Sequence, residues 1–148
     1  LSMAMRILLG GDHAGFDLKR ELKDHLEQSG FDVEDVGTLA NESVDYPEFA
    51  HKVADGVSDG SADLGIVICG SGNGVNISAN KHHGVRSALA WNATVAALAR
   101  QHNNANVLAL PARFVTTAEA KVIVDAFLAA RFEGGRHQRR VEKIEPHA

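Results

Sequence analysis

The sequence predicts an α/β fold built on a doubly wound parallel sheet of five strands. Five short apolar runs of strand length alternate with amphipathic segments of helix length along the 148-residue chain, which is the pattern of consecutive βαβ units. The run 64–69 is apolar throughout, as expected for a central strand that is covered on both faces. Because crossovers between parallel strands are right-handed, these units place helices on both faces of one sheet.

The N-terminal part supplies two strands and two helices. A strand is expected at 6–10, followed by a helix at 16–29 in which leucines recur every four residues before Gly30 ends it. The run 31–36 alternates apolar and polar side chains, which suits an edge strand. The next helix begins near Pro47, since proline is tolerated in a first helical turn. Its apolar face consists of Ala50, Val53, Ala54 and Val57.

The middle of the chain continues the alternation. After the central strand, a glycine-rich loop leads into a helix near Val75. Strands are expected at 85–90 and 106–110. Between them, Asn92 is suited to cap a helix that runs to about Gln101.

Capping residues and glycines define the C-terminal part. Thr116 and Glu119 have the spacing of a capping box, which predicts a long helix ending near Phe132. The glycine pair at 134–135 breaks this helix, and 136–144 is expected to form a short charged helix.

Composition excludes several classes of protein. Hydrophobic residues make up 45% and charged residues 23%, as in ordinary globular domains. The net charge of −4 argues against non-specific nucleic-acid binding, and no apolar run approaches the ~20 residues that span a bilayer. One cysteine forms no intrachain disulfide, and without a signal-peptide pattern a cytoplasmic location is expected. We expect one domain over 5–144, with 1–4 as an added or disordered start and 145–148 as a tail.

The loop at 69–74, CGSGNG, is the first candidate site. It follows a buried strand and enters a helix, so its backbone N–H groups form a cradle for an anion or a polar ligand. Val75 stands where a dinucleotide fingerprint requires a third glycine, which argues against nicotinamide binding. Cys69 lies beside the helix N-terminus, where the pKa of a thiol tends to fall; the alternative is a small buried apolar residue. The glycines are expected to let the substrate lie nearly on the loop backbone.

Other candidate residues are polar, and those near Asp12 and Arg113 follow strands, where parallel sheets bind their ligands. Asp12 caps a helix or contacts a ligand, and the adjacent His13 supplies a donor for an anion. His102 is expected in the link between a helix and the fifth strand, either as a site residue or as a histidine at a helix C-terminus. Arg136 and Arg140 share a helix face and, with Arg113, form either an oxyanion clamp or a solvated basic surface.

No metal site is expected. The eight histidines include no pair at His-x-x-x-His spacing on an expected helix, and His82 and His83 are adjacent rather than spaced for chelation.

Taken together, these segments resemble one family: ribose-5-phosphate isomerase type B and its galactose-6-phosphate and allose-6-phosphate isomerase relatives. The resemblance covers Met5 to about Ile144 and rests on motifs in one order. They are GDHAGF at 11–16, DYP at 45–47, CGSGNG at 69–74 with ANK at 79–81, RQHN at 100–103 and EGGRHQRR at 133–140.

The resemblance implies a Rossmann-like three-layer sandwich that works without a metal or organic cofactor. It implies an aldose–ketose isomerase of the non-oxidative pentose phosphate pathway, active as a homodimer or tetramer with sites shared between chains. It also implies that Cys69 is the general base acting on the open-chain sugar. Family members without this cysteine use a glutamate after the loop, where this sequence has Val75.

Further roles are implied residue by residue. Ser71 resembles the hydroxyl that moves a proton between the enediolate oxygens, and His102 the histidine that opens the sugar ring. The remaining residues match groups that bind the substrate. They are Asp12 and Asn103 near the sugar oxygens; His13, Arg113, Arg136 and Arg140 at the phosphate; Tyr46 and His137 lining the pocket; and the backbone of Gly70, Ser71, Gly72, Asn73 and Gly74 as the oxyanion hole.

Two alternatives remain open. A six-carbon sugar phosphate would use the same chemistry in a deeper pocket. A non-catalytic sugar-phosphate-binding module would keep the arginines but would not need Cys69 as a base, and fold alone does not distinguish these functions.

Overall fold

A five-stranded parallel sheet with the strand order β2-β1-β3-β5-β4 forms the centre of the computed structural model, which describes residues 4–146. The α/β prediction is therefore confirmed. The strands are β1 (Arg6–Gly11), β2 (Asp32–Asp35), β3 (Leu64–Cys69), β4 (Ser87–Leu89) and β5 (Val107–Pro111). The helices are α1 (Phe16–Gln28), α2 (Tyr46–Ser58), α3 (Asn73–Ala79), α4 (Ala93–Asn103), α5 (Thr117–Ala129) and α6 (Arg136–Glu142), with a short 3-10 turn, η1, at His13–Gly15. Residues 1–3, 147 and 148, from the expected flanking segments, lie outside the described residues.

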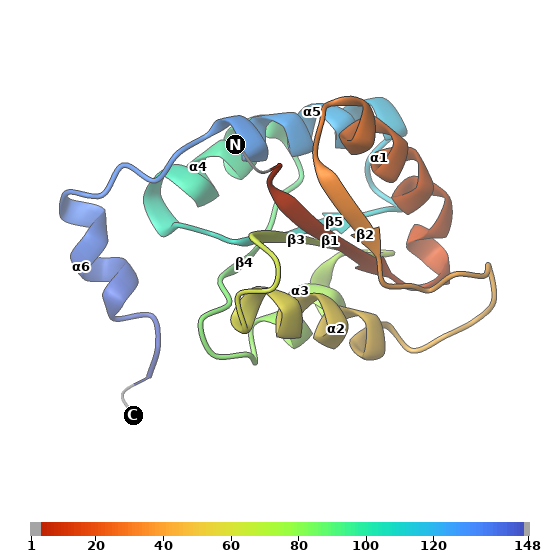
Figure 1. Cartoon of the computed structure of the whole chain (residues 1–148), viewed down its shortest axis with the longest axis horizontal. Coiled ribbons are helices and arrows are strands. Elements are labelled where there is room, and N and C mark those ends of the chain that lie inside the picture. Colours follow the sequence, from red (N-terminus) through yellow and green to blue (C-terminus); the bar gives the residue numbers. More distant parts are fainter. Residues whose placement is uncertain (1–3, 147–148) are drawn as a thin grey trace.

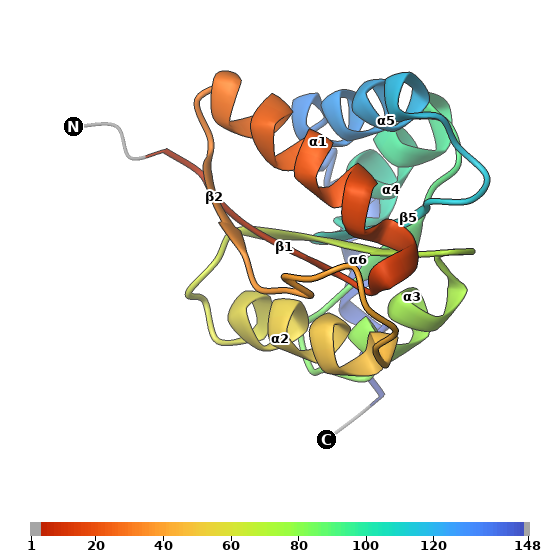
Figure 2. The ribbon, with the colours of Figure 1, turned by 90° about the vertical axis from the view of Figure 1, so that its right-hand side faces the viewer.

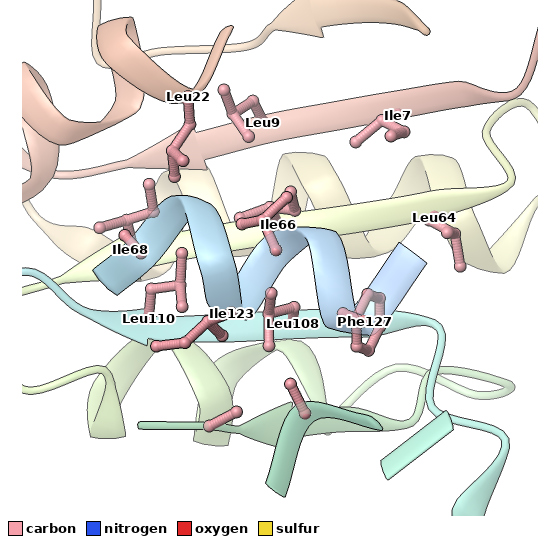
Figure 3. Packing of buried hydrophobic residues seen from close by; sticks show 14 of the residues in the cluster. Ile7, Leu9, Leu22, Leu64, Ile66, Ile68, Leu108, Leu110, Ile123 and Phe127 are labelled. Atoms are coloured by element: carbon pink, nitrogen blue, oxygen red, sulfur yellow. The ribbon is translucent and has the colours of Figure 1, made fainter. Parts of the chain in front are cut away.

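Helices cover both faces of the sheet, which gives three layers (Figures 1 and 2). Helices α1, α4 and α5 pack on one face and α2 and α3 on the other. On the first face, Leu22 of α1 and Phe127 of α5 lie over the side chains of β1, β3 and β5 (Figure 3). All six residues of β3 are buried, which explains why its sequence is apolar throughout.

Capping residues set the helix bounds much as the sequence predicts. The side chain of Thr116 accepts a hydrogen bond from the N–H of Glu119, whose own carboxylate accepts from the N–H of Thr116, so the capping box is confirmed. Asn92 caps α4 as expected. Helix α4 continues to Asn103, two residues beyond the expected end, because Asn104 takes the left-handed conformation that ends it (φ 49°). Helix α5 ends at Ala129, before the expected Phe132, since Ala130 is already extended.

A buried lysine fixes the segment that follows β2. The side chain of Lys19 is 1% exposed, and its ammonium pairs with the carboxylate of Asp35 and donates to the carbonyl of Thr38 at 2.9 Å. The same segment joins the end of β1, because the N–H of Thr38 donates to the carbonyl of Gly11 at 2.7 Å. A buried charge needs such partners, and here the pairing holds the loop beside Asp12.

Helix α6 lies apart from the layers, on the far side of the molecule from α1 (Figure 1). It packs against α4, and the chain beyond it returns to the body. There, Glu145 accepts a hydrogen bond from the N–H of Gly84 at 2.7 Å and lies 3.3 Å from Nδ1 of His83. Glu145, the first residue of the expected tail, thus contacts the body of the domain, and we call this contact between Glu145 and residues 83–84 the clasp.

Candidate active site

The structure divides the expected site residues of one chain between two hollows. The first hollow, of about 530 Å³, lies at the carboxyl ends of β1, β3 and β5. It is lined by Asp12, Tyr46, Cys69, Gly70, Ser71, Gly74, Arg113 and Phe114. The second hollow, of about 350 Å³, lies between the end of α4 and α6. It is lined by His102, Asn103, Arg136, His137, Arg140, Val141 and Ile144.

Cys69 is the last residue of β3 and forms the floor of the first hollow. Cys69 is 5% exposed, and its carbonyl accepts a hydrogen bond from the N–H of Ala112 at 2.9 Å. The carbonyl of Gly70 likewise accepts from the N–H of Arg113 at 3.0 Å. Because each peptide unit is planar and trans, the N–H groups of Gly70 and Ser71 point away from residues 112–113. The loop is therefore pinned on one side, which orients its donors on the other.

The loop glycines make room for the protein's own side chains, a packing role in addition to the expected approach of the substrate to the loop. A Cβ atom on Gly74 would overlap the ring of Tyr46, and one on Gly70 would lie 3.2 Å from Cδ of Arg113. Gly72 has a φ of 77°, and a Cβ there would lie 2.5 Å from Leu89. Glycine is thus required so that Tyr46 and Arg113 can lie against the loop.

The Ser71 side chain orders the start of α3. The hydroxyl of Ser71 is exposed, and it accepts a hydrogen bond from the N–H of Asn73 at 3.2 Å. Asn73 is the first residue of α3 and is also exposed. The Ser71 hydroxyl keeps its own hydrogen to donate to a ligand.

Asp12 and His13 follow β1 at the same edge of the sheet. Asp12 is 7% exposed, and its Oδ1 accepts from the N–H of Ala14 at 3.0 Å, so it caps η1 while it lines the first hollow. Nδ1 of His13 accepts from the N–H of Val44 at 3.3 Å. This contact places the ring hydrogen on Nε2, where it can be donated to an anion.

The second hollow is built around two stacked imidazoles. His102 lies in the final turn of α4, not in the link after it as expected, because the helix runs two residues further. Its ring stacks on that of His137, with centroids 4.2 Å apart and planes 13° from parallel. Burial lowers the pKa of His137, the charges of His102, Arg136 and Arg140 lower it further, and Glu133 opposes them.

The three arginines expected at the phosphate do not lie close together within one chain. Arg136 and Arg140 are exposed on α6, one helical turn apart, whereas Arg113 lies in the first hollow. Of the residues expected at the phosphate, His13 and Arg113 thus belong to the region of the first hollow, and Arg136 and Arg140 belong to the second.

A group of possible metal ligands, His102, Glu133 and His137, lies at the second hollow's two histidines, although the sequence suggested none. Their ligand atoms lie within 4.8 Å of one another. However, imidazole nitrogens bind an ion in the plane of the ring, and the planes of the two rings are nearly parallel. The lone pairs therefore do not converge on one point, and the arrangement suits a shared hydrogen bond better than an ion.

The two hollows lie at opposite edges of the sheet. Cys69 pairs with Pro111 at the carboxyl end of β5, whereas Gly65 pairs with Val107 at its amino end. Four strand residues span about 13 Å, and His102 precedes Val107 on the amino side. The thiol and the imidazole of one chain therefore do not act on the same atom.

Two residues were missed by sequence reasoning. Phe114 is 75% exposed and lines the first hollow. Glu133 stands beside both imidazoles of the second hollow, 3.7 Å from His102 and 3.6 Å from His137. The spacing of Glu133 and His137, four residues apart, was the available signal for the second residue.

Comparison with known proteins gives concordant matches. Residues 7–144 match the model of a family described as Ribose/Galactose Isomerase. Ribose-5-phosphate isomerase B of Escherichia coli is 50% identical over 139 residues, which cover 94% of this chain and 93% of that protein.

Two solved structures superpose closely. Ribose-5-phosphate isomerase B of Clostridium thermocellum has a TM-score of 0.94 and 52% identity, and the match covers 95% of each chain. The Mycoplasma genitalium enzyme of the same name, with bound ribulose-5-phosphate, has a TM-score of 0.93 and 52% identity over 97% of this chain and 95% of that one. Among residues 4–146, no helix is both long and apolar enough to cross a membrane.

Proposed function

The chain belongs to the ribose/galactose isomerase family, and on that premise we propose that it interconverts ribose 5-phosphate and ribulose 5-phosphate. The observation that carries the proposal is the first hollow, where a thiol, a hydroxyl and a pinned glycine loop line one space. Its relatives bear the name ribose-5-phosphate isomerase B, and one is solved with ribulose-5-phosphate bound. This support favours a catalytic function over a binding module, which needs no base.

Cys69 is the proposed base. Its thiolate removes the proton from carbon 2 of the open-chain aldose, and the C–H electrons form the carbon–carbon double bond of a cis-enediolate while the carbonyl oxygen takes the charge. The thiol then returns the proton to carbon 1 and gives the ketose, so the step consumes no other reactant. Donors from the loop at 70–74 and the Ser71 hydroxyl stabilise the oxyanion and move a proton between its two oxygens.

His102 is proposed to open the sugar ring. Ring opening breaks the bond between carbon 1 and the ring oxygen, moves a proton from the carbon 1 hydroxyl and adds one to that oxygen. An imidazole that accepts the first proton and donates the second carries the same number of protons before and after the step. We also propose that Asn103 and Asp12 contact sugar hydroxyls, which their positions in the lining of the two hollows support.

We propose that each complete site combines the first hollow of one chain with the second hollow of its partner in a homodimer or a larger assembly. The separation of Cys69 from His102 within one chain supports this arrangement, and so does the exposure of Arg136 and Arg140. The phosphate would then be held by His13 and Arg113 of one protomer and by both α6 arginines of the other. Tyr46 would line the half of the site from the first hollow, and His137 the half from the second. We also propose a cytoplasmic location, which would keep the Cys69 thiol reduced.

A panel of aldose phosphates tests the function. We expect ketose formation from ribose 5-phosphate, with kcat/KM at least about tenfold above that for allose 6-phosphate or galactose 6-phosphate. The family name also includes galactose. A preference for a six-carbon sugar would therefore mean that the chain is an isomerase of a six-carbon sugar phosphate. Binding of these sugars without any ketose formation would refute an isomerase.

A further inference from the structure

One carboxylate, that of Glu133, lies beside the second hollow, next to groups that are neutral or cationic. It approaches His102 and His137, and its charge acts on His137 against those of Arg136 and Arg140. The backbone N–H of Glu133 donates to the carbonyl of Gln101 at 3.0 Å. This bond ties the segment between α5 and α6 to the last turn of α4 and brings the carboxylate to the imidazoles.

One oxygen of Glu133 faces both rings. Oε1 lies 3.7 Å from Nε2 of His102 and 3.6 Å from Nε2 of His137. A carboxylate oxygen has two lone pairs and can accept from both nitrogens. Its position favours the tautomer of each ring that carries hydrogen on Nε2. Both distances exceed an ordinary hydrogen bond, so in this structure the carboxylate acts on the two N–H groups through its charge.

We propose that Glu133 is a positioning residue for the ring-opening histidine. It holds the stacked His102–His137 pair by their Nε2–H groups and leaves Nδ1 of His102 to exchange protons with the sugar. The inference rests on the proposed role of His102 in ring opening, and it adds a carboxylate–imidazole pair in the half of the site that lacks the thiol.

Two reactions separate ring opening from proton transfer. Ribose 5-phosphate is mainly cyclic and must be opened. Ribulose 5-phosphate stays open, because its phosphate blocks the hydroxyl that would close a five-membered ring. Exchange of its carbon 1 hydrogen with deuterium from D₂O, followed by NMR, therefore reports the thiol's proton transfer without any ring step.

For Glu133→Gln we expect the kcat for ribose 5-phosphate to fall by about tenfold to a hundredfold, within the range of general acid–base effects. Deuterium exchange into ribulose 5-phosphate should stay within about twofold of wild type, and Glu133→Asp should recover part of the loss. Glu142→Gln is the matched control, since Glu142 is an exposed carboxylate on α6 that bonds Gln138 at 2.8 Å. It should leave both reactions unchanged.

A second measurement does not depend on turnover. Because the Glu133 charge raises the pKa of His137, Glu133→Gln should move the NMR titration midpoint of the His137 ring proton to lower pH, while Glu142→Gln should not.

Equal loss in both reactions, an unchanged kcat for ribose 5-phosphate or an unmoved His137 midpoint would each overturn the role of Glu133. A wild-type chain that catalyses neither reaction would instead refute the proposed function. The two failures are therefore distinguishable.

Discussion

The position of Cys69 suits both of the roles that sequence reasoning treated as alternatives. It packs with Val67, Val75 and Ala109 in the buried cluster beneath α2 and α3, and it also forms the floor of the first hollow. A thiol fits both roles because it is small and apolar when protonated and a nucleophile or base when ionised.

Replacing this thiol tests the proposed base. Cys69→Ala should lower kcat for ribose 5-phosphate by about 10²- to 10⁴-fold, because no other thiol can take the proton. Calorimetric titration should still detect substrate binding, since the loop donors and arginines remain. Turnover near the wild-type rate would contradict the assignment.

Single residues also show where prediction from sequence fails. The motif identified the loop at 69–74, but not that Tyr46, 28 positions before Gly74, would lie against it. That contact depends on where the N-terminus of α2 docks, which no local pattern encodes. The contact of Glu133 with His102 is also not local, because Glu133 lies between α5 and α6 and His102 lies in α4; its spacing to His137 was the only local signal.

At the scale of elements, local signals were sufficient to predict the strands and most helix starts. Capping residues such as Asn92 and Thr116 act through hydrogen bonds to N–H groups within the next three residues, so a short window contains the information. Helix ends were less accurate, by two residues in α4 and three in α5, because backbone conformation at Asn104 and Ala130 decides them.

The clasp makes α6 sensitive to a residue outside it. Glu145→Ala removes the hydrogen bond to Gly84 and the contact with His83, so the helix that carries Arg136 and Arg140 should be held less firmly. Loss of a charge-assisted hydrogen bond at a partly exposed site should raise KM by up to about tenfold with little change in kcat.

Steady-state kinetics check this expectation, with Glu142→Ala as the control on the same helix. An unchanged KM for Glu145→Ala would mean that the contact with α4 alone positions α6.

At the scale of the whole molecule, the parallel sheet and its two covered faces follow from βαβ winding, whereas the strand order β2-β1-β3-β5-β4 does not. Sequence patterns place His102 near the start of β5 and Cys69 at the end of β3. In a parallel sheet these two places lie at opposite edges, and the register between the strands confirms this.

This division predicts complementation between inactive variants. Cys69→Ala and His102→Asn, each deficient in turnover of ribose 5-phosphate, should regain about a quarter of wild-type activity when equal amounts are unfolded and refolded together. Random pairing makes half of the dimers mixed, and each mixed dimer has one intact site of two. The activity of the refolded mixture is compared with that of each variant refolded alone, and a mixture no more active than its components would argue for a site within one chain.

The opposite placement of the two hollows also constrains how the protomers face each other. For the first hollow of one chain to meet the second hollow of the other, a two-fold axis must run across the strands rather than along them. The sheets of the two protomers then point in opposite directions, and one operation brings both pairs of hollows together. Such a dimer is closed, contains two equivalent centres and leaves no unmatched half exposed for a third copy.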